Sequence, residues 1–291
     1  MSDMANPPAA STEPVPTPPR RRLAFLARRV LLPLVALYLT IVVGMMFLET
    51  RLVYPIPSLS WGNWHPSAFK YADVNFTSAD GTKLHGWYVA QPNPTYAILY
   101  CHGNGEDVSS VGPFAADLSK ALQASVFVFD YRGYGNSEGT PNEAGCIADG
   151  SAAQEWLASK MQMDKSNVVV WGRSLGSGVA CAMAAQNGAR ALILESSFTS
   201  MPDIASLHYP WLPVRWIMKN RYDNLSRIKR YKGVVFQSHG TEDTLIPIAL
   251  AKALFDAAPE RKRWFEFQGG HNDAPPPDFY QRVADYLKSG S

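Results

Sequence analysis

A serine between two glycines is the residue with the clearest chemical potential in this chain. Residues 168–178 read VVVWGRSLGSG, so that a β-branched apolar run leads into Gly-x-Ser-x-Gly centred on Ser174. A serine at a sharp strand-to-helix turn needs glycine two residues before and after it, because a Cβ there would collide with the neighbouring strand and helix. The small residues that follow, VACAMAA, can pack a helix closely against a sheet. We therefore predict that Ser174 is a nucleophile; the alternative is a glycine-rich turn with a bystander serine.

The chain has six histidines from which a general base for this serine could come. A serine hydroxyl is a poor nucleophile until an imidazole, itself held by a carboxylate, accepts its proton. His271 follows the last predicted strand through Gln-Gly-Gly, a loop from which an imidazole can reach the serine. His102 and His239 each end a predicted strand before a glycine, which favours structural hydrogen bonding, and His65 and His85 are expected on the surface or in a hairpin. We predict His271 as the base.

Asp243 is the predicted carboxylate partner. It follows the preceding strand and comes before a predicted helix, and the order serine, aspartate, histidine along the chain is the one expected for such a sheet. Glu242 is the second candidate and Asp273 the third. The structural alternative for Asp243 is a helix N-cap.

An attacked carbonyl also needs backbone N–H groups to stabilise its developing negative charge. Leu175, directly after the nucleophile, supplies one by position. The other is expected from the loop CHGNGED after the first long parallel strand, where we choose Asn104 and then Gly103. The alternative is that these glycines only form a tight turn.

Strand-like and helix-like segments alternate along the chain after a hairpin. This alternation predicts an α/β fold, with a mostly parallel sheet covered by helices on both faces and reactive groups at the carboxyl ends of the strands. The predicted strands cover residues 71–77, 84–90, 97–101, 125–130, 167–171, 191–195, 233–238 and 263–268, and the predicted helices cover 109–123, 143–161, the segment after 174, 247–258 and 278–288.

An uncharged apolar run, Val30 to Leu48, precedes this domain. As a helix its 19 residues would span about 28 Å, close to the hydrocarbon core of a bilayer. A cleaved signal peptide or a buried helix of the main domain could contain a similar apolar run. Because no Ala-x-Ala cleavage site follows the run, we predict a retained transmembrane anchor. Five arginines precede the run, whereas Glu49 and Arg51 nearly cancel after it. The amino terminus is therefore expected in the cytoplasm, and the main domain in a periplasm, a lumen or the cell exterior.

The expected organisation is a disordered, Pro-rich basic leader at residues 1–22, the anchor at 23–50 and the main domain at 51–291. Residues 1–29 carry a net charge of +3, which leaves −1 for the rest of the chain and argues against nucleic acid as a partner. Cys101, Cys146 and Cys181 form no metal-ligand spacing and read as free buried thiols. No metal and no organic cofactor is implied.

Residues 201–224 are too apolar for a bare loop and are expected to form a small cap after the sixth strand. His208, Trp211 and Trp216 are its candidate contacts to substrate, and their character favours an acyl or otherwise apolar, lipid-like substrate. The alternative is that these groups simply pack the cap onto the sheet.

Several stretches together resemble the membrane-anchored BEM46-like group of the α/β-hydrolase family. They are HGN at 102–104, DYRGYGNSEG at 130–139, GRSLG at 172–176, ESSFTS at 195–200, RYD at 221–223, HGTED at 239–243 and GHND at 270–273. The resemblance implies Ser174, Asp243 and His271 as a catalytic triad.

Three further residues, Asp130, Arg132 and Tyr134, are expected to brace the loop beneath the site. The predicted activity is that of a serine hydrolase acting on carboxylic esters or thioesters. A peptidase of the same fold and a tethered scaffold without turnover are the alternatives.

Overall fold

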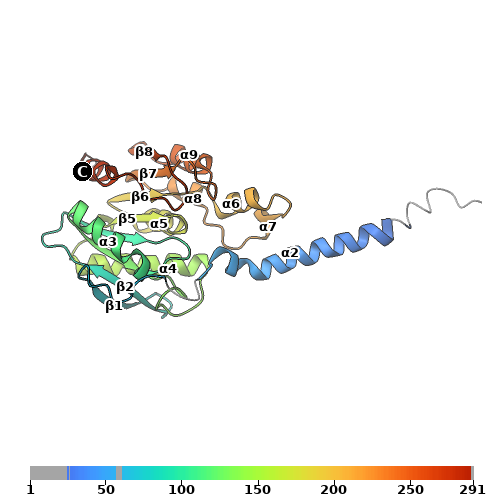
Figure 1. The fold of residues 1–291 in the computed structure, drawn as a ribbon, viewed down its shortest axis with the longest axis horizontal. Helices are drawn as coiled ribbons and strands as arrows, with labels where there is room; N and C mark the ends of the chain where they lie inside the picture. The colour runs from blue at the N-terminus through green and yellow to red at the C-terminus, as the bar shows by residue number, and fades with distance from the viewer. Residues whose placement is uncertain (1–24, 26, 57–60, 290–291) are drawn as a thin grey trace, which may run out of the picture. The chain divides into compact units, whose positions relative to one another are not determined.

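The computed structural model describes residues 25, 27–56 and 61–289 and divides the chain into two compact units, residues 1–47 and 48–291 (Figure 1). In the first unit, the π-helical turn η1 (Ala27–Leu31) leads into helix α2 (Leu32–Val53), whose last turns belong to the second unit. The helix Ala27–Val53 is long and apolar enough to cross a membrane. It runs five residues past the end of the uncharged run at Leu48 and three past the expected end of the anchor at Thr50. The predicted leader, 1–22, lies outside the described residues.

The second unit is built on a sheet of eight strands within the described residues, in the order β1-β2-β4-β3-β5-β6-β7-β8. The pairs β1–β2 and β2–β4 are antiparallel, and all other neighbours are parallel. The strands are β1 (Ala72–Thr77), β2 (Lys83–Val89), β3 (Tyr96–Cys101), β4 (Ala124–Phe129), β5 (Val169–Arg173), β6 (Ala191–Glu195), β7 (Val234–Gly240) and β8 (Lys262–Phe267).

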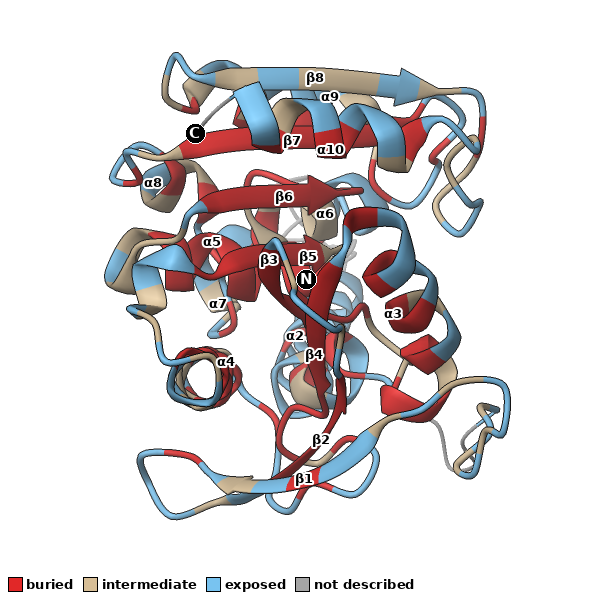
Figure 2. Cartoon of the chain, turned by 90° about the vertical axis from the view of Figure 1, so that its left-hand side faces the viewer, coloured by how far each residue is buried: buried red, intermediate tan, exposed pale blue. Residues whose placement is uncertain are grey.

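Helices cover both faces of this sheet, as Figure 2 shows with its buried central strands between helical layers. They are α3 (Val108–Leu122), α4 (Glu143–Lys160), α5 (Leu175–Asn187), α6 (Met201–His208), α7 (Val214–Ile217), α8 (Asn224–Ile228), α9 (Ile248–Ala257) and α10 (Phe279–Ser289), with a 3₁₀ turn, η2, at Lys165–Asn167. Alternate residues of each strand face opposite sides. Leu99 and Val170 accordingly pack in a core with α4, α5, α8 and α9, whereas Ile98 and Trp171 pack in a second core with α3 and α10.

The predicted fold class is confirmed, and every predicted strand is present to within about two residues. The difference that matters most for chemistry concerns β5. It was expected to end at Trp171 but continues to Arg173, so that Ser174 follows the strand directly.

Candidate active site

Ser174 occupies a one-residue turn between β5 and α5. Its backbone has φ 51° and ψ −120°, a left-handed value that a serine adopts only where its surroundings enforce it. A Cβ on Gly172 would overlap the carbonyl oxygen of Gly176, and one on Gly176 would overlap that of Cys101 on β3. The two glycines are therefore needed for the reason expected from the pattern, and the turn holds the serine at the carboxyl end of β5.

Three of the predicted side chains form one hydrogen-bonded chain. His271 Nε2 lies 2.9 Å from Ser174 Oγ, and His271 Nδ1 lies 2.7 Å from Asp243 Oδ2. The serine follows β5, the aspartate follows β7 and the histidine follows β8, so that the carboxyl ends of three parallel strands bring them together. Such an arrangement can transfer the serine proton to the imidazole while the carboxylate orients the ring.

Asp243 is buried and held in a turn before α9. Its Oδ1 accepts hydrogen bonds from the backbone N–H groups of Leu245 (3.0 Å) and Ile246 (2.8 Å), and His239 Nε2 lies 3.3 Å from its Oδ2. Burial raises the pKa of Asp243, but the hydrogen bonds from His239, His271 and the backbone of Ile246 outweigh burial and hold that pKa below its usual range. The carboxylate is therefore charged at neutral pH.

The two other candidate carboxylates have different partners. Glu242 Oε1 accepts a hydrogen bond from Gln268 Nε2 at 3.1 Å, and Asp273 Oδ2 accepts one from the backbone N–H of Gly270 at 2.7 Å. Asp273 thus stabilises the loop that carries His271 without bonding its ring.

The predicted oxyanion donors belong to elements that meet at Ser174. Leu175 begins α5, where backbone N–H groups have no acceptor within the helix. The neighbouring loop approaches closely, since a Cβ on Gly103 would lie 3.6 Å from Ser174 Cβ. The Gly103 N–H already donates to Glu106 Oε2 at 2.6 Å. This engagement favours Asn104 over Gly103 as the second donor.

Asn104 is held by two hydrogen bonds of its side chain. Tyr134 Oη donates to Asn104 Oδ1 at 2.8 Å, and Asn104 Nδ2 donates to the carbonyl of Val53 at 2.6 Å. Tyr134 is thus one of the bracing residues, as expected. The hydrogen bond to Val53, in the last turn of α2, was not predicted from the sequence.

The other two expected bracing residues are buried and fully bonded. Asp130 accepts from the Val108 N–H at 2.9 Å, at the start of α3, and Arg132 makes a forked pair with Asp149. His85 is not a surface histidine, because its ring is buried with Nδ1 3.2 Å from Asp130 Oδ2 and Nε2 2.9 Å from Asp73 Oδ1. It therefore ties the β1–β2 hairpin to the loop after β4.

A residue that the sequence analysis passed over, Arg173, connects the parts of this site. Its Nη1 pairs with Glu106 Oε1 at 2.5 Å, and its Nη2 donates to the His271 carbonyl at 3.0 Å and to Asn272 Oδ1 at 3.1 Å. One guanidinium thus connects β5, which precedes Ser174, with two loops. The first is residues 101–107, which we call the oxyanion loop after its proposed role, and the second is the loop that carries His271. The only signal in the sequence is a charge inside the elbow motif and an opposite charge in the glycine-rich loop.

Glu49 is another residue whose role the sequence did not predict. It was interpreted only as a charge that flanks the apolar run. Its Oε1 accepts hydrogen bonds from the backbone N–H groups of Lys219 (2.9 Å) and Asn220 (2.8 Å) and from Asn220 Nδ2 (2.9 Å). Tyr54 Oη donates to Asn220 Oδ1 at 2.9 Å. Within the second unit, the last turn of α2 therefore contacts both the oxyanion loop and the segment after α7. We call the bonds of Glu49 and Tyr54 to Asn220 and Lys219 the anchor clasp.

The expected cap consists of α6 and α7, which pack on each other, and the segments around them. His208 Nε2 lies 2.9 Å from the carbonyl of Leu245, in the turn that holds Asp243. Trp211 is 53% exposed and Trp216 is 87% exposed. The histidine thus contacts the site loop, whereas both tryptophans present most of their surface outward.

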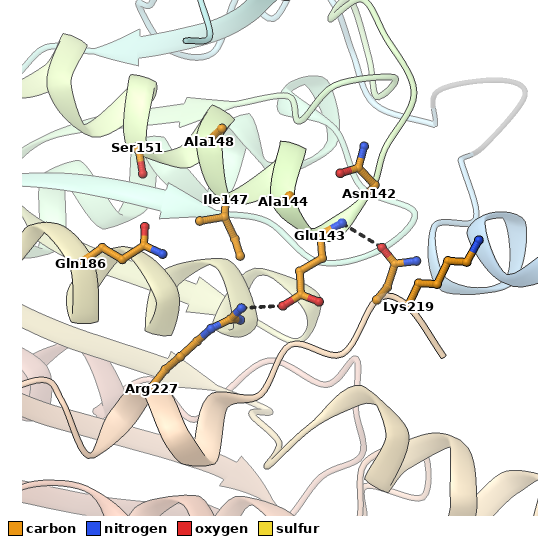
Figure 3. A pocket seen from close by; sticks show the side chains of 10 residues that line it. Asn142, Glu143, Ala144, Ile147, Ala148, Ser151, Gln186, Lys219 and Arg227 are labelled. Atoms are coloured by element: carbon orange, nitrogen blue, oxygen red, sulfur yellow. Dashed lines mark hydrogen bonds and ion pairs between the residues drawn. The ribbon is translucent and has the colours of Figure 1, made fainter. Parts of the chain in front are cut away.

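Two further features stand apart from this chemistry. In the described part of the chain, no group of three or more His, Cys, Asp or Glu residues could hold a metal ion, and the three cysteines are free and buried. A cleft of about 560 Å³, drawn in Figure 3, contains none of the predicted site residues. It is lined by Asn142, Glu143, Ala144, Ile147, Ala148, Ser151, Gln186, Lys219, Asn220 and Arg227.

Comparison with known proteins agrees with this architecture. Residues 96–227 match the family model of the alpha/beta hydrolase fold. The uncharacterized protein Rv2307c of Mycobacterium tuberculosis is 38% identical over 254 residues, which cover 83% of this chain and 88% of that protein. Protein bem46 of Schizosaccharomyces pombe is 32% identical over 231 residues, covering 75% and 77%.

The solved structure of the Pyrococcus furiosus esterase Pf2001 shares the fold, with a TM-score of 0.67 at 21% identity over 81% of this chain and 98% of that one. The chain belongs to the α/β-hydrolase family, in the BEM46-like group.

Proposed function

We propose that this protein is a serine hydrolase that cleaves carboxylic esters or thioesters through an acyl-enzyme on Ser174. The observation that carries the proposal is the hydrogen-bonded chain from Ser174 through His271 to Asp243. Ser174 Oγ attacks the carbonyl carbon while its proton moves to His271 Nε2. The imidazolium then protonates the leaving alcohol or thiol as its bond to the acyl carbon breaks. Water, deprotonated by the same imidazole, releases the acid and restores Ser174.

The environment of the three side chains supports each step. Asp243 is charged at neutral pH and can stabilise the imidazolium that forms on His271. The backbone N–H groups of Leu175 and Asn104 are the proposed donors to the oxyanion, each contributing about 10²- to 10³-fold in rate.

The substrate is proposed to carry an apolar acyl group, and the protein to be a single-pass membrane protein. The aromatic side chains of the cap support the first part. A structural neighbour that is named an esterase supports an ester as the bond that is cleaved. The apolar helix Ala27–Val53 supports the second. The arginines before the helix favour a cytoplasmic amino terminus and a catalytic unit outside the cytoplasm.

The test is labelling of the full chain in detergent with a fluorophosphonate probe, followed by hydrolysis of short and long acyl esters and thioesters. Labelling is expected to disappear in Ser174→Ala and to fall at least about a hundredfold in rate in His271→Ala. Ser159→Ala, which removes an exposed serine of α4, is the matched control and should label normally. Folded protein that takes up no probe, or labels equally in Ser174→Ala, would overturn the proposal.

A further inference from the structure

The cap carries a concentration of apolar side chains that expose much of their surface. The exposed fractions are 54% for Leu207, 39% for Tyr209, 53% for Trp211, 87% for Trp216 and 48% for Leu245. We call these five residues the cap face. Large apolar side chains gathered in this way on the surface of a folded unit indicate a docking surface.

These residues belong to one continuous region. Four of them come from the short segment 207–216 at the end of α6 and in α7, and these two helices pack on each other. The fifth, Leu245, is joined to this segment by the 2.9 Å contact between its carbonyl and His208 Nε2. Figure 1 shows α6 and α7 standing apart from the layers of the sheet.

The charge around the cap face indicates what it meets. Residues 207–221 include Arg215, Lys219 and Arg221 and contain no aspartate or glutamate, and Arg215 is paired with Asp203 of α6 at 2.7 Å. Tryptophan and tyrosine favour the boundary between hydrocarbon and water, and basic residues next to them favour anionic headgroups. Aromatic, aliphatic and basic side chains together therefore match a phospholipid surface better than a charged protein partner.

The anchor clasp supplies the location. Glu49 is the first charged residue after the uncharged run that ends at Leu48, so in a bilayer that holds this run Glu49 lies at the membrane surface. Its carboxylate is bonded to the backbone N–H groups of Lys219 and Asn220. Trp216 comes three residues before Lys219 in the chain, so the exposed tryptophan is tethered next to the same surface.

We propose that the cap face docks on the bilayer in which the protein is anchored, with Trp211 and Trp216 inserted at the headgroup boundary. This inference rests on the membrane anchoring put forward under Proposed function. Since His208 of the same cap touches the turn that holds Asp243, docking places the cap between the lipid and the site. The substrate class it fits is an acyl ester or thioester that resides in the membrane.

The experiment uses the full chain in vesicles of phosphatidylcholine and phosphatidylglycerol. Because the three native cysteines are buried, Trp216→Cys provides an accessible thiol for an environment-sensitive fluorophore. Lipids with nitroxide groups on their acyl chains are expected to quench this probe at least about twofold, since interfacial side chains insert by about 5–10 Å. The control site outside the cap is Trp264 on the edge strand β8, which is half-buried against Phe255, and no quenching is expected for Trp264→Cys. Tyr209→Cys serves as a second reporter of the cap face if Trp216→Cys fails to fold.

Three outcomes decide the matter. Quenching at Trp216→Cys without quenching at Trp264→Cys supports docking. A probe that stays in water in vesicles overturns it. A probe that is shielded equally in detergent, in a concentration-dependent way and without lipid quenching, also overturns it and assigns the face to a second copy of the chain. Fluorophosphonate labelling of the same samples tests the proposed hydrolase activity separately, because the probe reacts at Ser174 and does not report on the cap.

Discussion

At the scale of single residues, the site depends on side chains that hold others in place as much as on the three that would react. Ser174, His271 and Asp243 come from three loops, and a shift of about 1 Å in one of them can lower a rate about a hundredfold. Backbone donors at Leu245 and Ile246 hold Asp243, and Arg173 holds the loop of His271. Substitutions at these positions separate chemistry from positioning.

The role of Asp243 can be tested against its neighbour. Asp243→Asn keeps the shape but removes the charge that would stabilise the imidazolium, and we expect kcat to fall about 10³- to 10⁴-fold. Glu242→Gln is the matched control, because Glu242 is exposed and bonded to Gln268, and its kcat should stay within about twofold of the wild type. Ester hydrolysis measured at saturating substrate checks both. Equal losses in the two variants would contradict the assignment.

Arg173 is expected to act by positioning. Arg173→Met removes the pair with Glu106 and the bonds to His271 and Asn272, so the two loops lose their common support. We expect kcat to fall about ten- to a hundredfold, while KM for a short soluble ester changes little.

A lysine can pair with Glu106 but lacks the planar fork that reaches the second loop. Arg173→Lys should therefore restore only part of the activity. Full activity of Arg173→Met would show that the pair is not needed.

At the scale of elements, the last turn of α2 belongs to the second compact unit and not to the anchor alone. Glu49 accepts three hydrogen bonds from Lys219 and Asn220, and the Val53 carbonyl accepts one from Asn104. An element expected only to anchor the protein thus supports both the cap and the oxyanion loop.

Glu49→Ala leaves the part-buried backbone donor of Lys219 and the two buried donors of Asn220 without their acceptor. We expect this to destabilise the cap by about 1–3 kcal/mol and to make residues 201–224 cleavable by protease at concentrations that leave the wild type intact. Arg51→Ala is the control, because Arg51 is an exposed residue of the same helix. Mapping the first cleavage site by mass spectrometry distinguishes local opening of the cap from global unfolding. First cleavage outside residues 201–224 in both variants would contradict the role of the anchor clasp.

At the scale of the whole molecule, a buried histidine makes stability depend on pH. Burial lowers the pKa of His85, but its hydrogen bonds to Asp130 and Asp73 outweigh burial and raise the pKa above the ordinary value. Folding therefore favours the protonated ring. The resulting stabilisation is complete below the pKa of an unfolded histidine and is lost as the pH rises through the folded-state value.

His85→Gln should remove this dependence. We expect the difference in Tm between wild type and variant to be larger at about pH 5.5 than at about pH 8.5, on either side of the ordinary histidine pKa. Thermal unfolding of the full chain in detergent measures it, with His65→Gln as an exposed control. A difference that grows with pH would have the wrong sign for this account.

The elements and much of the candidate site could be predicted from the amino-acid sequence alone. Period-two apolar strands, glycines around Ser174 and polar residues directly after strands are local signals, and the fold class and the meeting of Ser174, Asp243 and His271 followed from them. The choice of Asp243 over Glu242 was also made from the sequence, from its place between a strand and a predicted helix, and Asp243 is the carboxylate that lies 2.7 Å from His271 Nδ1.

Contacts between segments far apart in the chain could not be predicted in this way and follow from the tertiary structure. Arg173 and Glu106 are 67 positions apart, and Glu49 and Asn220 are 171 apart. Any exposed charge is compatible with solvent, so the sequence contains no signal that one will find a buried partner. The surroundings of His85 were missed for the same reason, since pairing with Asp130 depends on how β2 and β4 lie side by side. Partners of this kind exist only once strand order and loop packing are set.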